Sequence, residues 1–265
     1  NSLVWSGGTI QGGGTTTVSS GAGLTISGGP LTLLGSTLNN QSTTGQWTGN
    51  GTLTLHTGGT LLNNGTLTAT GDGTITRTNT GVFTNNGLFE KNGGAGTTTI
   101  NDNSTTLTNS SSGTIRVTTG TLDLLSTFNN QGLVDVAAGK TLNINGTGSG
   151  GGDYVIGSLA QVNLIGGTQT FDTTGGTPSI TGAGLFNVNG GTMFISTPLA
   201  ASNLQLAGGT PRDGAAALTV NNSLVWSGGT IQGGGTTTVA SGAGLTISGG
   251  PLTRLGSTLN NQSTT

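Results

Sequence analysis

The sequence predicts an all-β fold of the β-solenoid class, a right-handed parallel β-helix with about 22 residues per coil. Three observations predict it. Short apolar segments alternate with threonine, an asparagine recurs at a nearly constant interval, and the chain starts to repeat itself after 221 residues. The right-handed sense follows from the general crossover preference of parallel strands.

Strands of three to five residues are expected wherever Leu, Ile or Val alternates with a polar residue. Period two sends successive side chains to opposite faces of a strand, and threonine and branched aliphatic residues suit a pleated surface. Turns are expected at the Gly-Gly, Asn-Gly and Gly-Asp-Gly segments between the strands. The predicted strands include residues 52–55, 66–68, 74–76, 114–117, 121–124 and 133–136.

An asparagine follows a short apolar segment five times, at intervals of 24, 22, 24 and 20 residues. Hairpins would gain nothing from this spacing, whereas stacked coils bring equivalent residues about 4.8 Å apart. Stacked asparagines can form a structural ladder in which each amide donates to the next. The predicted ladder consists of Asn39, Asn40, Asn63, Asn64, Asn85, Asn86, Asn109, Asn129 and Asn130.

The first 44 residues return almost unchanged at the end of the chain. Residues 1–221 are therefore predicted to form one full solenoid repeat unit. Residues 222–265 are predicted to start the next, near-identical unit of a continuous solenoid, as in a fragment of a tandem array. About ten coils per unit, stacked at ~4.8 Å, would give a rise of roughly 48 Å.

Two positions differ between the two copies: Ser19 becomes Ala240, and Leu33 becomes Arg254. This tolerance predicts that residue 33 faces solvent or a groove between units. Two glycine-rich stretches, residues 146–153 and 200–216, are predicted to be longer loops or junctions between coils.

Composition excludes several partners. Charged residues make up 5% of the chain, the net charge is −2, and the six Lys and Arg residues are scattered. No basic stripe can neutralise phosphates, so no nucleic acid is expected. No apolar run approaches the roughly 20 residues that span a bilayer, so no membrane insertion is expected. The absence of cysteine excludes thiolate metal sites and cysteine nucleophiles.

No catalytic residue, cofactor or metal is predicted. A glycosidase needs two carboxyl groups about 5–10 Å apart, and Asp123 and Asp135 could approach each other on neighbouring strands. Their contexts, LDL and VDV, are those of solvent-facing positions. His56, the only histidine, follows a strand and is expected at an exposed or cap position. The eight acidic residues are Asp72, Glu90, Asp102, Asp123, Asp135, Asp153, Asp172 and Asp213.

Three weaker patterns point to binding. Residues 148–155 resemble a calcium-binding nonapeptide, but the motif is solitary and has Ser149 where the second glycine belongs. Repeated Thr-x-Thr could form the flat threonine face of an ice-binding solenoid, although threonine also suits any exposed strand. The tryptophans Trp5, Trp47 and Trp226 could stack on sugars if exposed, but core or corner packing is expected.

Several segments resemble the repeats of very large bacterial surface and secreted proteins, the filamentous-haemagglutinin and autotransporter-passenger β-solenoids. They include WSGGTI, GSTLNNQST, GTLLNNGTL, FTNNGLFEKNGG, STFNNQGLVDVAAGKTLNI and SITGAGLFNVNGGTM. The resemblance covers nearly the whole chain. It implies an extracellular or cell-surface stalk, adhesin or matrix component, and it carries no catalytic residues.

The sequence therefore favours a structural, non-enzymatic role as an extracellular bacterial fibre or stalk whose main partner is itself, through end-to-end or lateral contacts. The first alternative is an adhesin that binds surface glycans or ice through a solenoid face. The second alternative is a polysaccharide-active enzyme, which would show converging acidic or basic side chains in a cleft.

Overall fold

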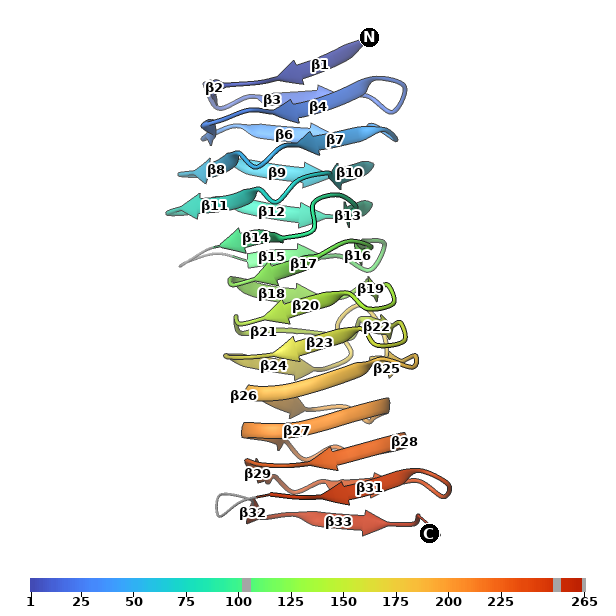
Figure 1. Ribbon diagram of the computed structural model, residues 1–265. Helices are drawn as coiled ribbons and strands as arrows, with labels where there is room; N and C mark the ends of the chain where they lie inside the picture. Colours follow the sequence, from blue (N-terminus) through green and yellow to red (C-terminus); the bar gives the residue numbers. More distant parts are fainter. Residues whose placement is uncertain (102–105, 250–253, 264–265) are drawn as a thin grey trace. The chain divides into compact units, whose positions relative to one another are not determined.

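A computed structural model describes residues 1–101, 106–249 and 254–263. Every described element is a β-strand, and the strands pair in parallel between successive coils about 22 residues apart, which makes a β-solenoid of about 11 turns. The predicted fold class is confirmed. The chain forms two compact units, Asn1–Leu133 and Val134–Thr265. Figure 1 shows the succession of strands along the chain.

Each coil of the first unit has three strands, and equivalent strands of successive coils pair with one another. One set contains β1 (Ser2–Trp5), β4 (Gly23–Ser27), β7 (Gly45–Thr48), β10 (Thr66–Ala69), β13 (Leu88–Lys91) and β16 (Thr114–Val117). The second contains β2 (Gly8–Gln11), β5 (Leu31–Leu34), β8 (Thr52–His56), β11 (Thr74–Thr78), β14 (Thr97–Asn101) and β17 (Thr121–Leu124). The third contains β3 (Thr15–Val18), β6 (Thr37–Asn40), β9 (Thr60–Asn63), β12 (Val82–Asn85), β15 (Thr106–Asn109) and β18 (Thr127–Asn130).

The second unit repeats this scheme with some longer strands. The division between the units falls within β19 (Leu133–Val136). The strands that follow are β20 (Thr141–Ile144), β21 (Gly148–Gly150), β22 (Asp153–Ile156), β23 (Gln161–Leu164), β24 (Thr168–Phe171), β25 (Ser179–Thr181), β26 (Leu185–Ile195), β27 (Leu199–Asp213), β28 (Leu218–Trp226), β29 (Thr230–Ile231), β30 (Thr236–Val239), β31 (Gly244–Ile247), β32 (Arg254–Leu255) and β33 (Thr258–Asn261).

The core follows directly from the period-two alternation. In β10, for example, Leu67 and Ala69 are buried while Thr66 and Thr68 remain partly exposed. Parallel register then places apolar residues of successive coils over one another, as with Leu67 and Phe89. Burying one such side chain stabilises the fold by roughly 1.5–3 kcal/mol, so each coil depends on its neighbours for most of its stability.

The two glycine-rich stretches are not simply loops, and this prediction was wrong. Residues 199–213 form the single long strand β27, and residues 148–150 form β21. The strand β27 pairs with both β25 and β26, and its register against β26 shifts near Gly208 and Gly209. Gly209 has φ +68°, and a Cβ there would lie 2.7 Å from the Gly190 carbonyl oxygen. A larger residue would be strained at this bend.

The prediction that residue 33 faces solvent or a groove between units is wrong for Leu33. Its side chain is completely buried, opposite Ile10 on one side and Leu55 on the other. Its counterpart Arg254 is exposed in the last described coil of the second unit.

No helix in the described ranges is long and apolar enough to cross a membrane.

Candidate functional site

A row of buried asparagines runs through the first unit along the third set of strands. Asn40 Nδ2 donates to Asn63 Oδ1 at 2.8 Å, and Asn63 Nδ2 donates to Asn85 Oδ1 at 2.7 Å. Asn85 Nδ2 donates to Asn109 Oδ1 at 2.8 Å, and Asn109 Nδ2 donates to Asn130 Oδ1 at 2.9 Å. All five side chains are buried. We call these five residues the inner ladder.

The inner ladder also closes the turn that follows each strand. Asn63 Nδ2 donates to the carbonyl oxygen of Leu88, and Asn109 Nδ2 donates to that of Leu133. A buried amide therefore satisfies both the neighbouring amide and a backbone carbonyl of the next coil. Buried polar groups in such a connected chain are stable only when every member is paired.

The other predicted ladder residues lie outside the core. Asn64 Nδ2 donates to Asn39 Oδ1, and Asn86 Nδ2 donates to Asn64 Oδ1, both at 2.8 Å and both exposed. Asn129 lies opposite Thr108 in the register of β18 and β15. The nine residues thus separate into the inner ladder, an exposed row of three and Asn129. Each Asn-Asn pair sends one member inward and one outward.

Three of the six basic residues are buried, which the sequence analysis did not anticipate. Arg77, Lys91 and Arg212 are at most 6% exposed. Arg77 donates to the carbonyl oxygen of Gly81, and Arg212 donates to those of Gly214 and Gln232 at 2.6 and 2.7 Å. Burial lowers the pKa of Arg212, and the neighbouring Asp213 carboxylate opposes that shift. These side chains hold the corners of coils by satisfying backbone carbonyls.

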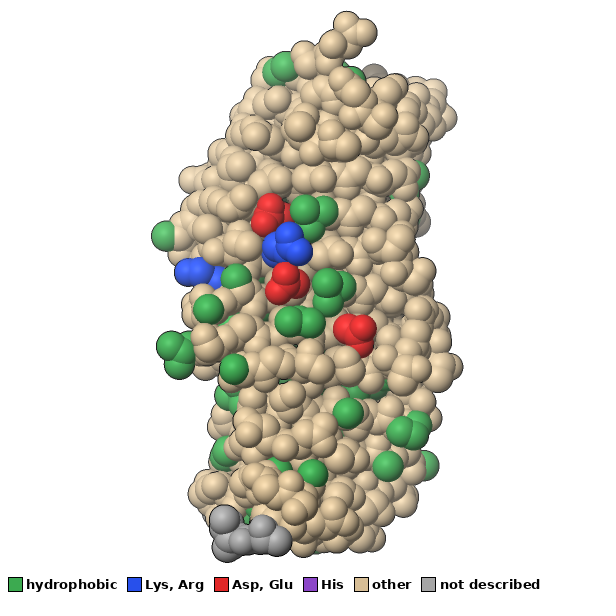
Figure 2. Space-filling model, turned by 90° about the vertical axis from the view of Figure 1, so that its right-hand side faces the viewer, with side chains coloured by type: hydrophobic (Ala, Val, Ile, Leu, Met, Phe, Trp, Pro, Cys, Tyr) green, Lys and Arg blue, Asp and Glu red, His purple; other side chains and the backbone are tan. Residues whose placement is uncertain are grey.

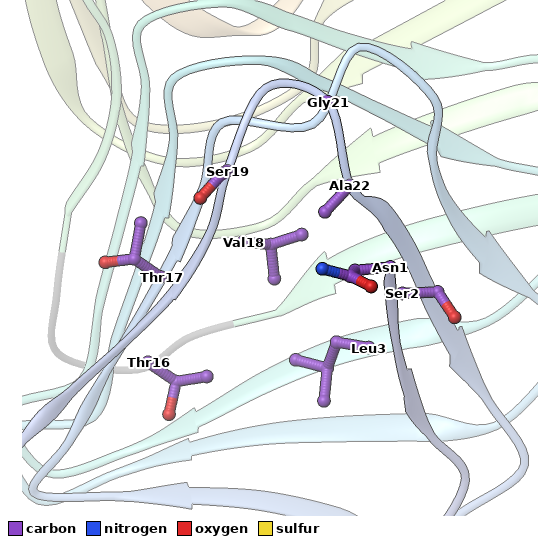
Figure 3. Close-up of a pocket in the computed structure, with 9 residues that line it drawn as sticks. All are labelled: Asn1, Ser2, Leu3, Thr16, Thr17, Val18, Ser19, Gly21 and Ala22. Atoms are coloured by element: carbon purple, nitrogen blue, oxygen red, sulfur yellow. The ribbon is translucent and has the colours of Figure 1, made fainter.

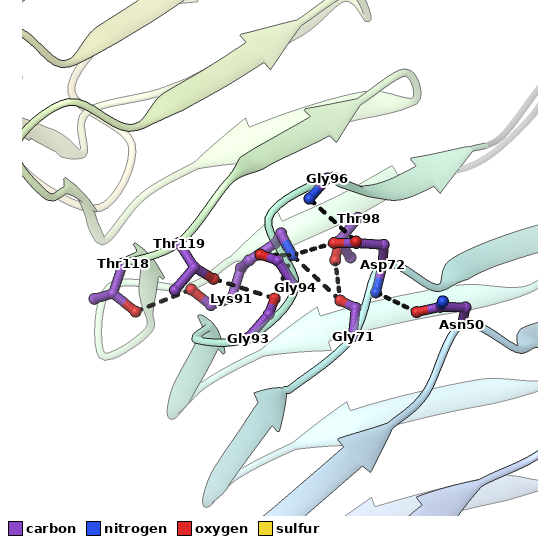
Figure 4. Close-up of polar contacts among 10 residues, drawn as sticks. All are labelled: Asn50, Gly71, Asp72, Lys91, Gly93, Gly94, Gly96, Thr98, Thr118 and Thr119. Atoms are coloured by element: carbon purple, nitrogen blue, oxygen red, sulfur yellow. Dashed lines mark hydrogen bonds and ion pairs between the residues drawn. The ribbon is translucent and has the colours of Figure 1, made fainter.

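The Lys91 ammonium group is enclosed by oxygen atoms (Figure 4). Its Nζ donates to the carbonyl oxygens of Gly71 and Gly93 at 3.2 and 2.5 Å, and to Asp72 Oδ1 at 2.8 Å. Lys91 is completely buried, whereas the Asp72 side chain is 28% exposed. Asp72 Oδ2 also accepts a hydrogen bond from the backbone of Gly96 at 3.1 Å. The ion pair between Lys91 and Asp72 therefore connects the turn after β10 with the turn after β13.

The Lys91 ammonium, which donates a hydrogen bond to Asp72, holds the pKa of that carboxyl below its ordinary value. Partial burial raises the pKa, while the Gly96 N–H and the charge of Lys91 lower it further. Because the pKa of Asp72 is lower in the folded chain than in the unfolded chain, its ionised carboxylate stabilises the fold at pH values above the unfolded-state pKa of about 3.9. This stabilisation is lost as the pH falls through the folded-state pKa.

We therefore expect the Asp72→Asn variant to lose less of its free energy of unfolding than the parent chain when the pH is lowered. The urea midpoint of the parent chain should fall between pH 6 and pH 2.5 by more than that of the variant, because only the parent protonates this carboxylate. Equal falls in both chains would show that the ion pair adds no pH-dependent stability.

Three further candidate residues, Asp123, Asp135 and His56, lie on three different strands of the described chain. Asp123 lies outward on β17, opposite Thr99, and Asp135 lies outward between the buried Val134 and Val136. His56 ends β8, where its Nδ1 lies 2.7 Å from Thr57 Oγ1. Asp102 lies outside the described residues. Among the residues that the structure describes, no three His, Asp or Glu side chains gather in a group that could hold a metal ion.

The three tryptophans are buried, with exposures of 6% for Trp5, 2% for Trp47 and 3% for Trp226. The expected core or corner packing is confirmed, and these rings are not available as sugar-stacking platforms in this conformation. The face drawn in Figure 2 carries few charged side chains, and its apolar side chains are scattered.

The fold and these contacts define the chain as a protein of the β-solenoid class. No protein-family model matches it, and no curated protein or solved structure shows significant similarity to it.

Proposed function

We propose that the chain is a structural component of an extracellular or cell-surface bacterial fibre, stalk or matrix, built from tandem solenoid repeats, and that it has no enzymatic activity. Its principal partner is a further copy of the same repeat. The resemblance to filamentous-haemagglutinin and autotransporter-passenger repeats supports the bacterial surface location.

The inner ladder is the observation that carries this proposal. Each coil from Asn40 to Asn130 is joined to the next by parallel backbone pairing, an apolar layer and a buried amide bond. Such contacts all act between neighbouring coils. They suit a chain whose task is to extend and to resist unfolding.

Electron microscopy of the concentrated full chain, together with immunogold labelling of intact producing cells, tests this proposal. We expect fibres at the cell surface, with an axial repeat near the roughly 48 Å that ten coils would give. Monomeric particles at every concentration, or label confined to the cell interior, would contradict it.

A binding role is the second candidate, and the arrangement of threonines favours it. Thr9, Thr32, Thr54 and Thr76 follow one another in register across four coils on the second set of strands. Thr52 and Thr74 form a parallel row, which Thr99 extends. The outward hydroxyl groups therefore form a lattice of about 4.8 Å between coils and about 6.6 Å along a strand.

A regular hydroxyl lattice fits an ordered surface such as ice or a crystalline glycan. The third Thr-x-Thr is out of phase, because Thr99 rather than Thr97 lies opposite Thr74, so the lattice is short. If it binds ice, the double variant Thr54→Lys/Thr76→Lys should lose the ability to shape growing ice crystals. Thr68→Lys, outward on β10, should retain it. No effect of the parent chain on ice would remove ice as the ligand of this lattice.

A further inference from the structure

One face of the second unit carries a dense set of carboxamide side chains. It is formed by β20, β23, the first half of β26 and the middle of β27, which pair in parallel one after another (Figure 1). Period-two alternation sends the residues between the buried core positions outward. We call the eight outward residues the amide face, because six of them are asparagine or glutamine. They are Thr141, Asn143, Gln161, Asn163, Leu185, Asn187, Asn203 and Gln205.

Three asparagines of the amide face form a hydrogen-bonded row. Asn163 Nδ2 donates to Asn143 Oδ1 at 2.9 Å, and Asn187 Nδ2 donates to Asn163 Oδ1 at 3.1 Å. A carboxamide has two N–H donors and an oxygen that accepts two hydrogen bonds. Asn163, in the middle, therefore uses one N–H and one lone pair within the row and keeps one of each for a group beyond it.

The row ends at an acceptor that lacks a donor. Asn187 Oδ1 is buried and has no hydrogen-bond partner within the described part of the chain. Gln205 follows Asn187 in register, and a carboxamide N–H is the kind of donor that this oxygen requires. Because a buried acceptor without a donor is costly, a contact that orders the Gln205 side chain over the row is favoured.

The amide face is chemically complementary to itself. None of its eight residues is charged, and the row has a direction, since each donor points to the preceding coil. A second copy related by a two-fold axis lays its row antiparallel to the first. The side-chain dipoles then oppose each other, which brings the remaining N–H groups of one row against acceptor oxygens of the other. Two-fold contacts between identical surfaces have this self-complementary form.

Other ligands fit the amide face less well. Its eight residues include no charged group for an ion and no aromatic ring on which a sugar could stack, and Leu185 is the only large apolar side chain among them. Apolar side chains gather instead in the first unit, where Leu3, Val18 and Ala22 point towards a hollow of about 450 Å³ (Figure 3). The amide face therefore requires a flat partner rich in hydrogen-bonding groups, and a second amide face is such a partner.

We propose that the amide face docks laterally on the amide face of a second copy of this chain, with the two solenoids antiparallel. The inference rests on the proposed function and specifies the lateral part of its self-contact. Four strands about 4.8 Å apart, each with about four residues at roughly 3.3 Å, give a surface of about 250 Å² per copy. A stable complex buries about 800 Å² per partner, so one pair of amide faces binds weakly. Repetition of the contact along a fibre strengthens it through multivalency.

Charges of either sign on the amide face test this contact. Gln161 and Gln205 lie beside the row and make none of its hydrogen bonds. One variant of the full chain carries Gln161→Glu/Gln205→Glu, and another carries Gln161→Lys/Gln205→Lys. Static light scattering at low salt gives the second virial coefficient, which reports weak attraction between chains before charges are screened. Urea midpoints close to that of the parent chain show that both variants are folded.

The matched control is Gln46→Lys/Thr68→Lys. Gln46 and Thr68 are outward register partners on β7 and β10, so this variant has the same net charge as the lysine variant of the amide face. We expect attraction between chains in the parent and in the control. Each amide-face variant alone should lose it, because like charges meet across the two-fold contact. An equimolar mixture of the glutamate and lysine variants should attract more strongly than the parent.

A mixture that attracts no more than its two components would overturn the amide face as a docking surface. A control that loses as much attraction as the lysine variant, or a parent chain without attraction, would overturn it as well. Fibres in electron micrographs of the lysine variant would leave the proposed function standing, since end-to-end contacts do not use this face. Attraction through the amide face without fibres at any concentration would contradict the proposed function alone.

Discussion

Replacing Asn85 by leucine is expected to lower the free energy of unfolding of the chain by about 3–6 kcal/mol, since each buried polar group left unpaired costs roughly 1–3 kcal/mol. Asn85 lies in the middle of the inner ladder and is completely buried. The variant would leave Asn63 Nδ2 without its side-chain acceptor and Asn109 Oδ1 without its donor. The carbonyl oxygen of Thr114 would also lose the hydrogen bond that it accepts at 3.0 Å.

Urea unfolding of the full chain, with amide hydrogen exchange to locate the loss, measures this effect. Protection should fall first in β12 and in the coils on either side of it. The matched control is Asn86→Ala, which removes an amide from the exposed row at the next position in the sequence. Its effect should be about 0.5 kcal/mol or less, as for most surface substitutions. Similar losses in both variants would mean that the inner ladder contributes no more than the outer row.

Replacing Lys91 by methionine is expected to lower the free energy of unfolding by about 2–4 kcal/mol, since a hydrogen bond to a charged group contributes roughly 1.5–3 kcal/mol. The charge left behind, Asp72, is 28% exposed and can be solvated by water. Methionine fills most of the volume of the lysine stem but cannot donate a hydrogen bond. The carbonyl oxygens of Gly71 and Gly93 would each lose one of two donors, and Asp72 would lose its counter-ion. The remaining donors are the hydroxyl groups of Thr98 and Thr119.

The control for Lys91 is Arg116→Met. Arg116 projects from the outer face of β16, opposite Glu90, so its replacement removes a cation without opening the core. Its effect should remain below about 1 kcal/mol, since surface substitutions usually change stability by roughly 0.5 kcal/mol or less. Equal urea midpoints for Lys91→Met and the parent chain would show that the enclosed ammonium is not needed to hold the turns.

The alternation of residues explains why these buried cations could have been predicted. In Leu88-Phe89-Glu90-Lys91, period two places Phe89 and Lys91 on the same face, and Phe89 is a core residue. Arg77 shares its face with Ile75 in the same way. Arg116 lies between the inward residues Ile115 and Val117 and faces outward. A count of basic residues that ignores the strand face on which each lies does not distinguish the buried Arg77 and Lys91 from the outward Arg116.

The sequence by itself determined the fold class, because apolar alternation and the recurring asparagine are local patterns that only stacked coils satisfy together. It also identified the asparagines that can form a ladder. Alternation from Leu38 and Phe83 sends Asn40 and Asn85 inward, but the adjacent Leu61 and Leu62 leave it undetermined whether Asn63 or Asn64 enters the core. Register decides this: Leu38 lies over Leu61, so Asn40 lies over Asn63.

Only the tertiary structure decided the environment of residues whose sequence contexts are equal. Leu33 and Arg254 occupy equivalent positions in two nearly identical segments, yet one is buried and the other exposed. Trp5 and Trp226 are both buried, yet only Trp226 has a partner for its indole N–H. The physical reason is that a coil is completed by the coils on either side of it, and neighbours about 22 residues away are not encoded in the segment that they cover.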